Sequence, residues 1–124
     1  MSDTIYARPL FRVRDVAASI AYYESKLGFA KAWVHGDPTL IIAQVGRDGC
    51  DIILDSSSVL SKPGTTSALS LSVNNLGTLD RELKDRGATI TAPPFSTVWQ
   101  RNVYQFDVID LDGNMLMFWG DKNE

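Results

Sequence analysis

The chain repeats one pattern, an apolar strand followed by a helix, at a spacing of 59 or 60 residues. In each copy the helix is indicated by apolar residues that recur on one helical face, and a glycine ends it. A unit of this kind cannot bury its apolar face alone, so the repeat predicts two similar sheets that pack together. The matched residues are Val13 and Val73, Asp15 and Asn75, and Gly28 and Gly87.

The first half, residues 1–55, is predicted to hold a strand, a helix and three further strands. Asp15 is a suitable N-cap for a helix over 16–27, where apolar residues follow the helical period. Turn-forming residues at 36–38 and 46–49 separate the later strands. The strands are expected at 5–13, 30–35, 39–45 and 50–55.

The second half, residues 67–124, follows a serine-rich linker at 56–66 and repeats the same order. Gly113-Asn114 lies between two apolar runs, which is a strong signal for a closing hairpin. Both faces of its last strand are apolar, so one should meet the core and the other should line a core or a pocket. The elements are expected as strands at 67–73 and 89–91, a helix at 76–86, irregular structure at 92–100, and hairpin strands at 103–109 and 115–119.

Charge and composition exclude several classes of partner. A formal charge of −3 disfavours nucleic acids and acidic membranes, because phosphate binding needs a clustered basic surface. No run approaches the roughly 18 apolar residues of a membrane span, and the N-terminus lacks the pattern of a signal peptide. The single cysteine, Cys50, excludes an internal disulfide. We therefore expect a cytoplasmic protein.

Four segments carry a resemblance to a known family. Residues 10–16, 20–23, 27–29 and 110–114 resemble the vicinal oxygen chelate superfamily, which includes glyoxalase I, the extradiol dioxygenases, and the fosfomycin and bleomycin resistance proteins. The resemblance implies an α+β fold in one domain over 1–124. In it, two tandem βαβββ modules form a cupped, barrel-like mixed sheet with the helices outside.

The resemblance also implies where a metal would bind. Metal-dependent members take ligands from four strand positions, which correspond here to Arg8, Ile53, Ala68 and Met117. A guanidinium offers no lone pair, Ile and Ala have no donor atom, and a thioether suits Cu(I) rather than the usual divalent ions. The single histidine, His35, is not at one of these positions. We therefore expect no metal and no cofactor.

Two arginines of the first strand are expected to give the cup a basic wall. Arg8 and Arg12 share one strand face by alternation, and in glyoxalase I the position that Arg12 resembles holds a substrate-binding arginine. A ligand with an anionic or carbonyl group would complement this wall. The alternative is that both arginines pair with Asp51, Asp55 or Asp107.

Small and aromatic side chains are expected to complete the cup. Ser70 widens it, and flat rings can stack on a planar ligand in a largely apolar pocket. The alternative for each aromatic residue is a place in the core or in a subunit interface. The predicted ligand-binding residues are Arg8, Arg12, Trp33, Ser70, Trp99, Tyr104, Gln105 and Met117.

Among superfamily members, the chain is most similar to the bleomycin resistance proteins, metal-free dimers that sequester a planar cationic drug between subunits. Pro9 resembles a proline that those proteins link to exchange of the N-terminal arm, so we expect a homodimer with possible arm exchange near Pro9. Two departures are the loss of a Gly-x-Arg-Glu-Phe motif at 103–106 and the positive charges of Arg8 and Arg12, which would repel such a drug.

Three functions remain open from the sequence. The first is a metal-free binding protein that sequesters an aromatic or amphipathic compound, such as an antibiotic, in a dimer cleft. The second is a divalent-metal-dependent lyase or dioxygenase of the same superfamily. The third is a structural or regulatory domain whose cleft is filled by its own side chains. No residue is singled out as catalytic, because Cys50 has no histidine near it in sequence.

Overall fold

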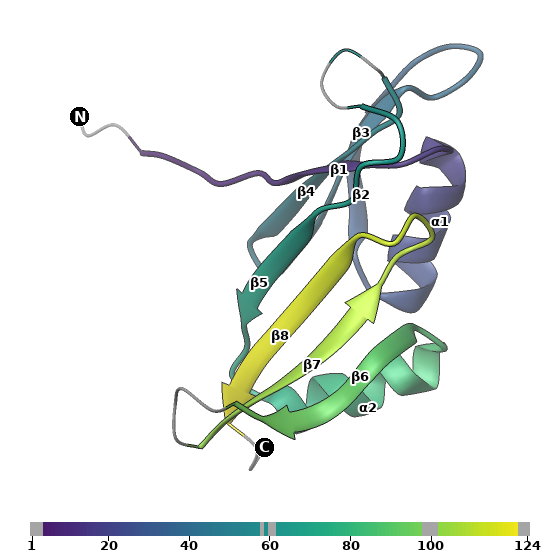
Figure 1. Ribbon diagram of the computed structural model, residues 1–124. Coiled ribbons are helices and arrows are strands. Elements are labelled where there is room, and N and C mark those ends of the chain that lie inside the picture. Colours follow the sequence, from purple (N-terminus) through teal and green to yellow (C-terminus); the bar gives the residue numbers. More distant parts are fainter. Residues whose placement is uncertain (1–3, 58, 60–61, 98–101, 122–124) are drawn as a thin grey trace.

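The computed structural model describes residues 4–57, 59, 62–97 and 102–121. It contains the βαβββ order twice, so the predicted α+β class and tandem modules are confirmed (Figure 1). The first module is β1 (Leu10–Arg12), α1 (Val16–Lys26), β2 (Ala30–His35), β3 (Ile42–Arg47) and β4 (Cys50–Asp55). The second is β5 (Ala68–Ser72), α2 (Leu76–Arg86), β6 (Thr89–Ser96), β7 (Val103–Ile109) and β8 (Met115–Asp121).

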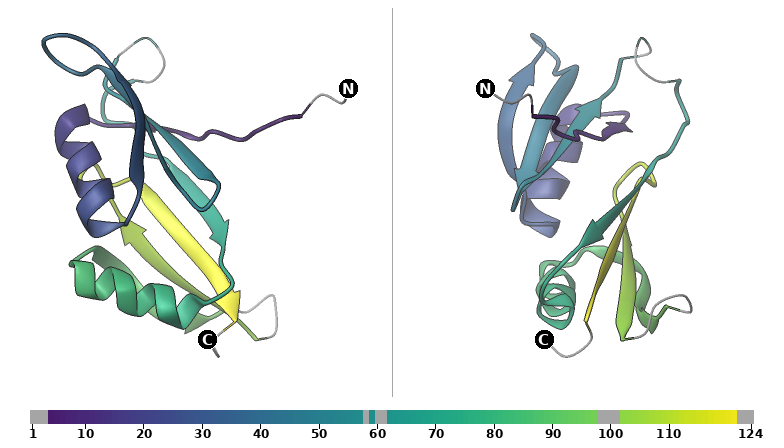
Figure 2. Two further views of the ribbon diagram at one scale, coloured as in Figure 1. Left: turned by 180° about the vertical axis from the view of Figure 1, so that it is seen from behind. Right: turned by 90° about the vertical axis from the view of Figure 1, so that its left-hand side faces the viewer.

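Each module forms its own four-stranded mixed sheet. The strand orders are β1-β4-β3-β2 and β5-β8-β7-β6, and in each sheet the first strand runs parallel to the last one of its module. The two sheets remain separate and open, so they do not close into a barrel (Figure 2). β1 and β5 are therefore edge strands.

The two helices form where the capping signals predicted them. The Asp15 carboxylate accepts a hydrogen bond from the backbone N–H of Ala18 at 3.0 Å, which satisfies one of the free donors at the start of α1. Gly87 ends α2 in the left-handed conformation, at φ +84°. None of the helices in the part of the chain that the structure describes is long and apolar enough to cross a membrane.

Two strands differ from the sequence prediction. β1 is shorter than expected, because the chain before it projects away from the sheet (Figure 1). The hydrogen bond from the backbone N–H of Ile53 to the carbonyl of Pro9 lies at the point where the chain joins β1. β6 is longer than expected and runs through Pro93 and Pro94. These prolines are tolerated because β6 is an edge strand, where a missing N–H costs no ladder bond.

One core joins the two modules on the helix-facing sides of their sheets. Alternate strand residues such as Phe11 and Leu54 in the first sheet, and Phe106 and Leu116 in the second, are fully buried and belong to one apolar cluster with residues of both helices. Burial of this apolar surface supplies most of the stability of the fold. The opposite face of each sheet contributes little to the cluster.

A buried polar network fixes the two modules against each other. Asn114 is fully buried, and its amide donates to the carbonyl of Arg12 and accepts from the N–H of Ser67, both at 2.9 Å. The Asp110 carboxylate accepts from the Asn114 amide and from the hydroxyl of Tyr23 on α1. The turn of the last hairpin therefore holds the first strand, the first helix and the start of the second module.

We predict that Asn114→Ala destabilises the protein by about 2–4 kcal/mol, because it removes three side-chain hydrogen bonds and leaves buried partners unsatisfied. Urea denaturation at neutral pH measures the change. The exposed Asn74→Ala is the matched control and should stay within about 0.5 kcal/mol of the parent. A loss below about 1 kcal/mol for Asn114→Ala would show that the network is not what joins the modules.

Candidate ligand-binding site

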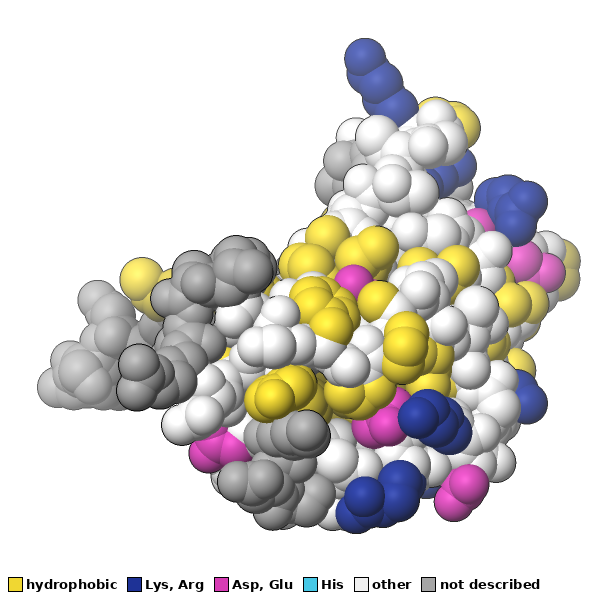
Figure 3. Space-filling model, turned by 60° about the horizontal axis from the view of Figure 1, so that its bottom comes forward, with side chains coloured by type: hydrophobic (Ala, Val, Ile, Leu, Met, Phe, Trp, Pro, Cys, Tyr) yellow, Lys and Arg dark blue, Asp and Glu magenta, His cyan; other side chains and the backbone are white. Residues whose placement is uncertain are grey.

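The face of the second sheet that points away from α2 is a regular array of side chains. Neighbouring strands place residues in three rows, and most of these side chains remain partly accessible to solvent. The rows, read from β5 to β6, are Ala68, Met115, Ile109 and Thr89; Ser70, Met117, Asp107 and Ala92; and Ser72, Trp119, Gln105 and Phe95. Figure 3 shows apolar side chains gathered across the middle of one face of the molecule, with an acidic side chain among them.

Three of the predicted site residues lie in this array. Ser70 and Met117 are neighbours in the middle row, and Gln105 occupies the next row. The Gln105 side chain is 6% exposed and donates a hydrogen bond from Nε2 to Oδ1 of Asp107 at 2.7 Å. The array therefore combines soft apolar side chains with one oriented carboxylate.

The equivalent face of the first sheet is organised around Gln44. Its Oε1 accepts hydrogen bonds from Nη1 of Arg8 and from Nε1 of Trp33, both at 3.2 Å. The structure thus brings two predicted site residues together, through a glutamine that the sequence reasoning missed. The signal was present, because Gln44 is the polar residue that alternation places on this face of an otherwise apolar strand.

Arg12 lies on the same face, beside Asp55 in the strand pairing. Among the ion pairs of residues 4–57, 59, 62–97 and 102–121, none joins Arg8 or Arg12 to an aspartate. Nη1 of Arg12 instead donates to the carbonyl of Ser57 at 2.5 Å. The Asp55 side chain is buried, and neither carboxylate oxygen has a hydrogen-bond partner among the described residues.

Tyr104 does not lie on the open face of its sheet. Tyr104 lies next to Gln105 in β7, so alternation turns it to the helix side, where it packs against the core. Trp99 lies outside the residues that the structure describes. Of the predicted tryptophans, Trp33 is therefore the one that the structure places on an open sheet face, where it is 39% exposed.

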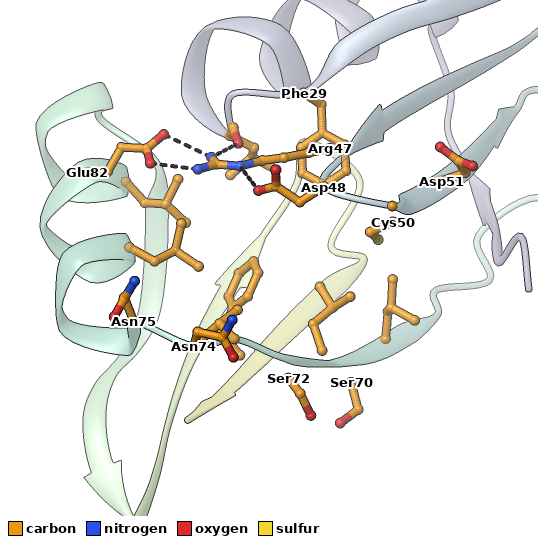
Figure 4. Close-up of a pocket in the computed structure, with 18 of the residues that line it drawn as sticks. Phe29, Arg47, Asp48, Cys50, Asp51, Ser70, Ser72, Asn74, Asn75 and Glu82 are labelled. Atoms are coloured by element: carbon orange, nitrogen blue, oxygen red, sulfur yellow. Dashed lines mark hydrogen bonds and ion pairs between the residues drawn. The ribbon is translucent and has the colours of Figure 1, made fainter. Parts of the chain in front are cut away.

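A separate cleft of 720 Å³ lies between the modules (Figure 4). One wall is β5, whose residues Leu69 to Ser72 all line the cleft, although Figure 4 shows the hydroxyls of Ser70 and Ser72 directed away from Cys50. The opposite wall is the start of β4, with Cys50 and Asp51. Ala7 of the N-terminal arm also lines it. The volume suits a small ligand or a side chain from another chain.

An ion-pair clasp closes one end of this cleft. The guanidinium of Arg47, from β3, donates to both carboxylate oxygens of Glu82 on α2, at 2.8 and 2.7 Å, and to the carbonyl of Leu27 at 2.8 Å. Gly28 permits the approach, because a Cβ at this position would lie 2.6 Å from Nη1 of Arg47. Arg86 donates a third hydrogen bond to Glu82, from Nε to Oε2 at 2.8 Å. The clasp links the first sheet to the second helix.

The thiol of Cys50, which lines the cleft, is not activated as a nucleophile. Burial raises the pKa of the Cys50 thiol, and the negative charge of Asp51 raises it further. The thiol therefore stays protonated at neutral pH, and the thiolate is the reactive form.

The four strand positions expected from the resemblance to correspond to metal ligands carry side chains that do not suit a divalent ion. The structure places Arg8 as a donor to Gln44, while Ile53, Ala68 and Met117 offer two hydrocarbons and a thioether. Among the described residues, no group of three His, Cys, Asp or Glu side chains lies close enough to hold a metal.

Comparisons with known proteins agree with the fold. A family model of the Glyoxalase/Bleomycin resistance protein/Dioxygenase superfamily matches residues 6–118. Solved structures superpose well: TioX from Micromonospora sp. ML1 gives a TM-score of 0.79 at 17% identity, over 95% of this chain and 99% of that one. A superfamily member from Sphaerobacter thermophilus DSM 20745 gives 0.77 at 24% identity, over 96% and 98%. A comparison with curated proteins finds no match.

We predict that the ion pair between Arg47 and Glu82 makes the free energy of unfolding fall as the solution becomes acidic. Hydrogen bonds from Arg47 lower the pKa of Glu82 below its ordinary value near 4.5, against an opposing effect of burial, and Arg86 lowers it further. Because the folded pKa is depressed, the stabilisation is present above the ordinary pKa and is lost as pH falls through the folded one.

Urea denaturation between pH 3 and 7 measures this dependence. The parent should lose more stability than Glu82→Gln as the pH drops. The exposed Glu24→Gln serves as the control and should follow the parent. Parallel curves for the parent and Glu82→Gln would contradict the prediction.

Proposed function

Because the chain belongs to the Glyoxalase/Bleomycin resistance protein/Dioxygenase superfamily, we propose that it is a metal-free protein that sequesters an aromatic or amphipathic small molecule, such as an antibiotic. The observation that carries this proposal is the replacement of all four metal-ligand positions by side chains that bind no divalent ion. The open sheet faces then serve to hold a compound rather than to transform it. The single cysteine supports action in the cytoplasm.

The chemistry of the two faces supports binding of a flat compound. In the first module, Trp33 and Arg8 are both held by Gln44, so an indole ring and a guanidinium are fixed side by side. In the second, Met117 and Trp119 offer polarisable apolar surface. An aromatic body with a carbonyl or anionic substituent would match the first face.

We further propose that the binding unit is a homodimer in which the first sheet of one subunit faces the second sheet of its partner. Within one chain both helices pack on the core-facing sides of the sheets, so neither helix covers the opposite face of either sheet. In a two-fold assembly each contact occurs twice, so both subunits would have the open faces of both sheets covered. A ligand would then be enclosed between them.

The N-terminal arm supports exchange between subunits near Pro9. Residues 4–8 are exposed, with Ile5 95% and Tyr6 80% accessible, and Pro9 is half-buried. The arm spans roughly 20 Å when extended, enough to follow all of β5, whose outer edge carries no partner strand among the described residues. Alternation places Ile5 on the face shared with Phe11, so in a partner it would pack on the Leu69 and Leu71 wall of the cleft.

We predict that planar amphipathic antibiotics, titrated against tryptophan fluorescence, bind with an affinity that EDTA does not change. The reason is that the proposed contacts use Trp33, Gln44 and Met117 rather than an ion. Elemental analysis of protein purified without chelators should give less than about a tenth of a metal ion per chain.

Each contrary outcome points to a different function. Stoichiometric metal, or binding abolished by EDTA, would favour the lyase or dioxygenase alternative. Absence of quenching and of thermal shift with every compound would favour a domain that binds no small molecule.

We predict that deletion of residues 1–7 converts the dimer into monomers, because it removes the strand that pairs with β5 of the partner. Ile5→Asp should weaken the dimer in the same direction, since a carboxylate would enter the apolar side of the cleft. Light scattering after size exclusion measures the mass. Val59→Asp, at another exposed apolar residue, is the control and should remain dimeric. A truncated chain that stays dimeric would rule out arm exchange.

A further inference from the structure

The second sheet's open array has a carboxylate at its centre. Asp107 occupies the middle row, between Ala92 and Met117, and the rows on either side bring Ile109 and Trp119 near it. It is the one ionisable acid or base among the twelve residues of the array. Two of the other three residues in its own row, Ser70 and Ala92, are small, which leaves room beside the carboxylate for a ligand.

The carboxylate is oriented by a buried neighbour. Gln105 is 6% exposed, and its Nε2 donates to Oδ1 of Asp107 at 2.7 Å. Among the described residues no other side-chain hydrogen bond or ion pair uses Asp107, so Oδ2 has capacity to accept from a group above the sheet. An ionised carboxylate amid apolar side chains gains most from a charged donor, because water is partly displaced there.

We propose that Asp107 is the specificity-determining residue of the ligand site and that the ligand presents to it a protonated amine or amidinium. This inference rests on the proposed binding function and adds the chemical class of one end of the ligand. The aromatic body next to the cation packs on Met115, Met117 and Trp119, whose thioethers and indole favour flat polarisable rings. Gln105 acts through Asp107 as a positioning residue.

Arg8 and Arg12 alone suggested a ligand with an anionic or carbonyl group, and Asp107 adds a cationic group to that expectation. Arg8 and Arg12 lie on the first sheet, and Asp107 lies on the second. A ligand enclosed between the first sheet of one subunit and the second sheet of its partner would meet opposite charges at its two ends. The site therefore selects amphoteric compounds, with the cation on the second-sheet side.

The test is calorimetric titration of the full chain with two aromatic amines, naphthylmethylamine and aminomethylanthracene, and with their neutral N-acetyl amides. The amines should bind more tightly than the amides. Asp107→Asn keeps the side-chain shape and the acceptor for Gln105, and it should weaken amine binding by about tenfold or more, with a much smaller effect on amide binding. Gln105→Met should weaken amine binding in the same direction, by a smaller factor.

Asp85→Asn, which removes an equal charge at an exposed position on α2, is the control and should bind like the parent. Amine binding that is indifferent to Asp107→Asn overturns the inference alone. The inference is also overturned if Asp107→Asn turns the dimer into monomers without changing the preference for amines, because Asp107 would then pair with an arginine of the partner. Binding of neither amines nor amides overturns the proposed binding function together with this inference.

Discussion

The buried contacts of Asp110 and Asn114 are the constraint on which the remaining structure depends. Burial raises the pKa of Asp110, but four donated hydrogen bonds oppose this, and the same carboxylate raises the already elevated pKa of Tyr23. The Tyr23 hydroxyl and the Asp110 carboxylate are held as hydrogen-bonding partners at 2.9 Å. Through them the last hairpin holds the first strand and first helix, so the two sheets have one relative placement.

That placement decides which surfaces are left for function. The helix-facing sides of both sheets merge into a single core, and the opposite sides stay open with ordered polar groups among apolar ones. Gln44 orders the first face and Gln105 the second, each by hydrogen bonds to a charged neighbour. A rigid sheet that carries pre-oriented polar groups loses little freedom on binding, which favours retention of a compound without chemistry.

Helix ends and turns that have local sequence signals were predictable, whereas features that depend on neighbouring strands were not. Asp15 and Gly87 marked their helix ends, and Gly113 marked the last turn, because capping and turn chemistry act within a few residues. The length of β6 was underestimated, because a strand that contains Pro93 is tolerated only at the edge of a sheet, and this position was not known from the sequence. On the sheet faces, alternation and the family register predicted the orientation of Arg8, Ser70 and Met117. The positions of Gln44 and Asp107 among their neighbours depend on cross-strand register, which one sequence does not reveal.

Methyl NMR of methionine- and leucine-labelled protein tests the central claim most directly, because adjacent strands present these residues on opposite faces. Met115 and Met117 lie on the open array, whereas Leu69 and Leu71 line the cleft on the other side. With a planar aromatic compound added, the account predicts that the Met115 and Met117 resonances shift while those of Leu69 and Leu71 hold their positions. Shifts confined to the two leucines would contradict it.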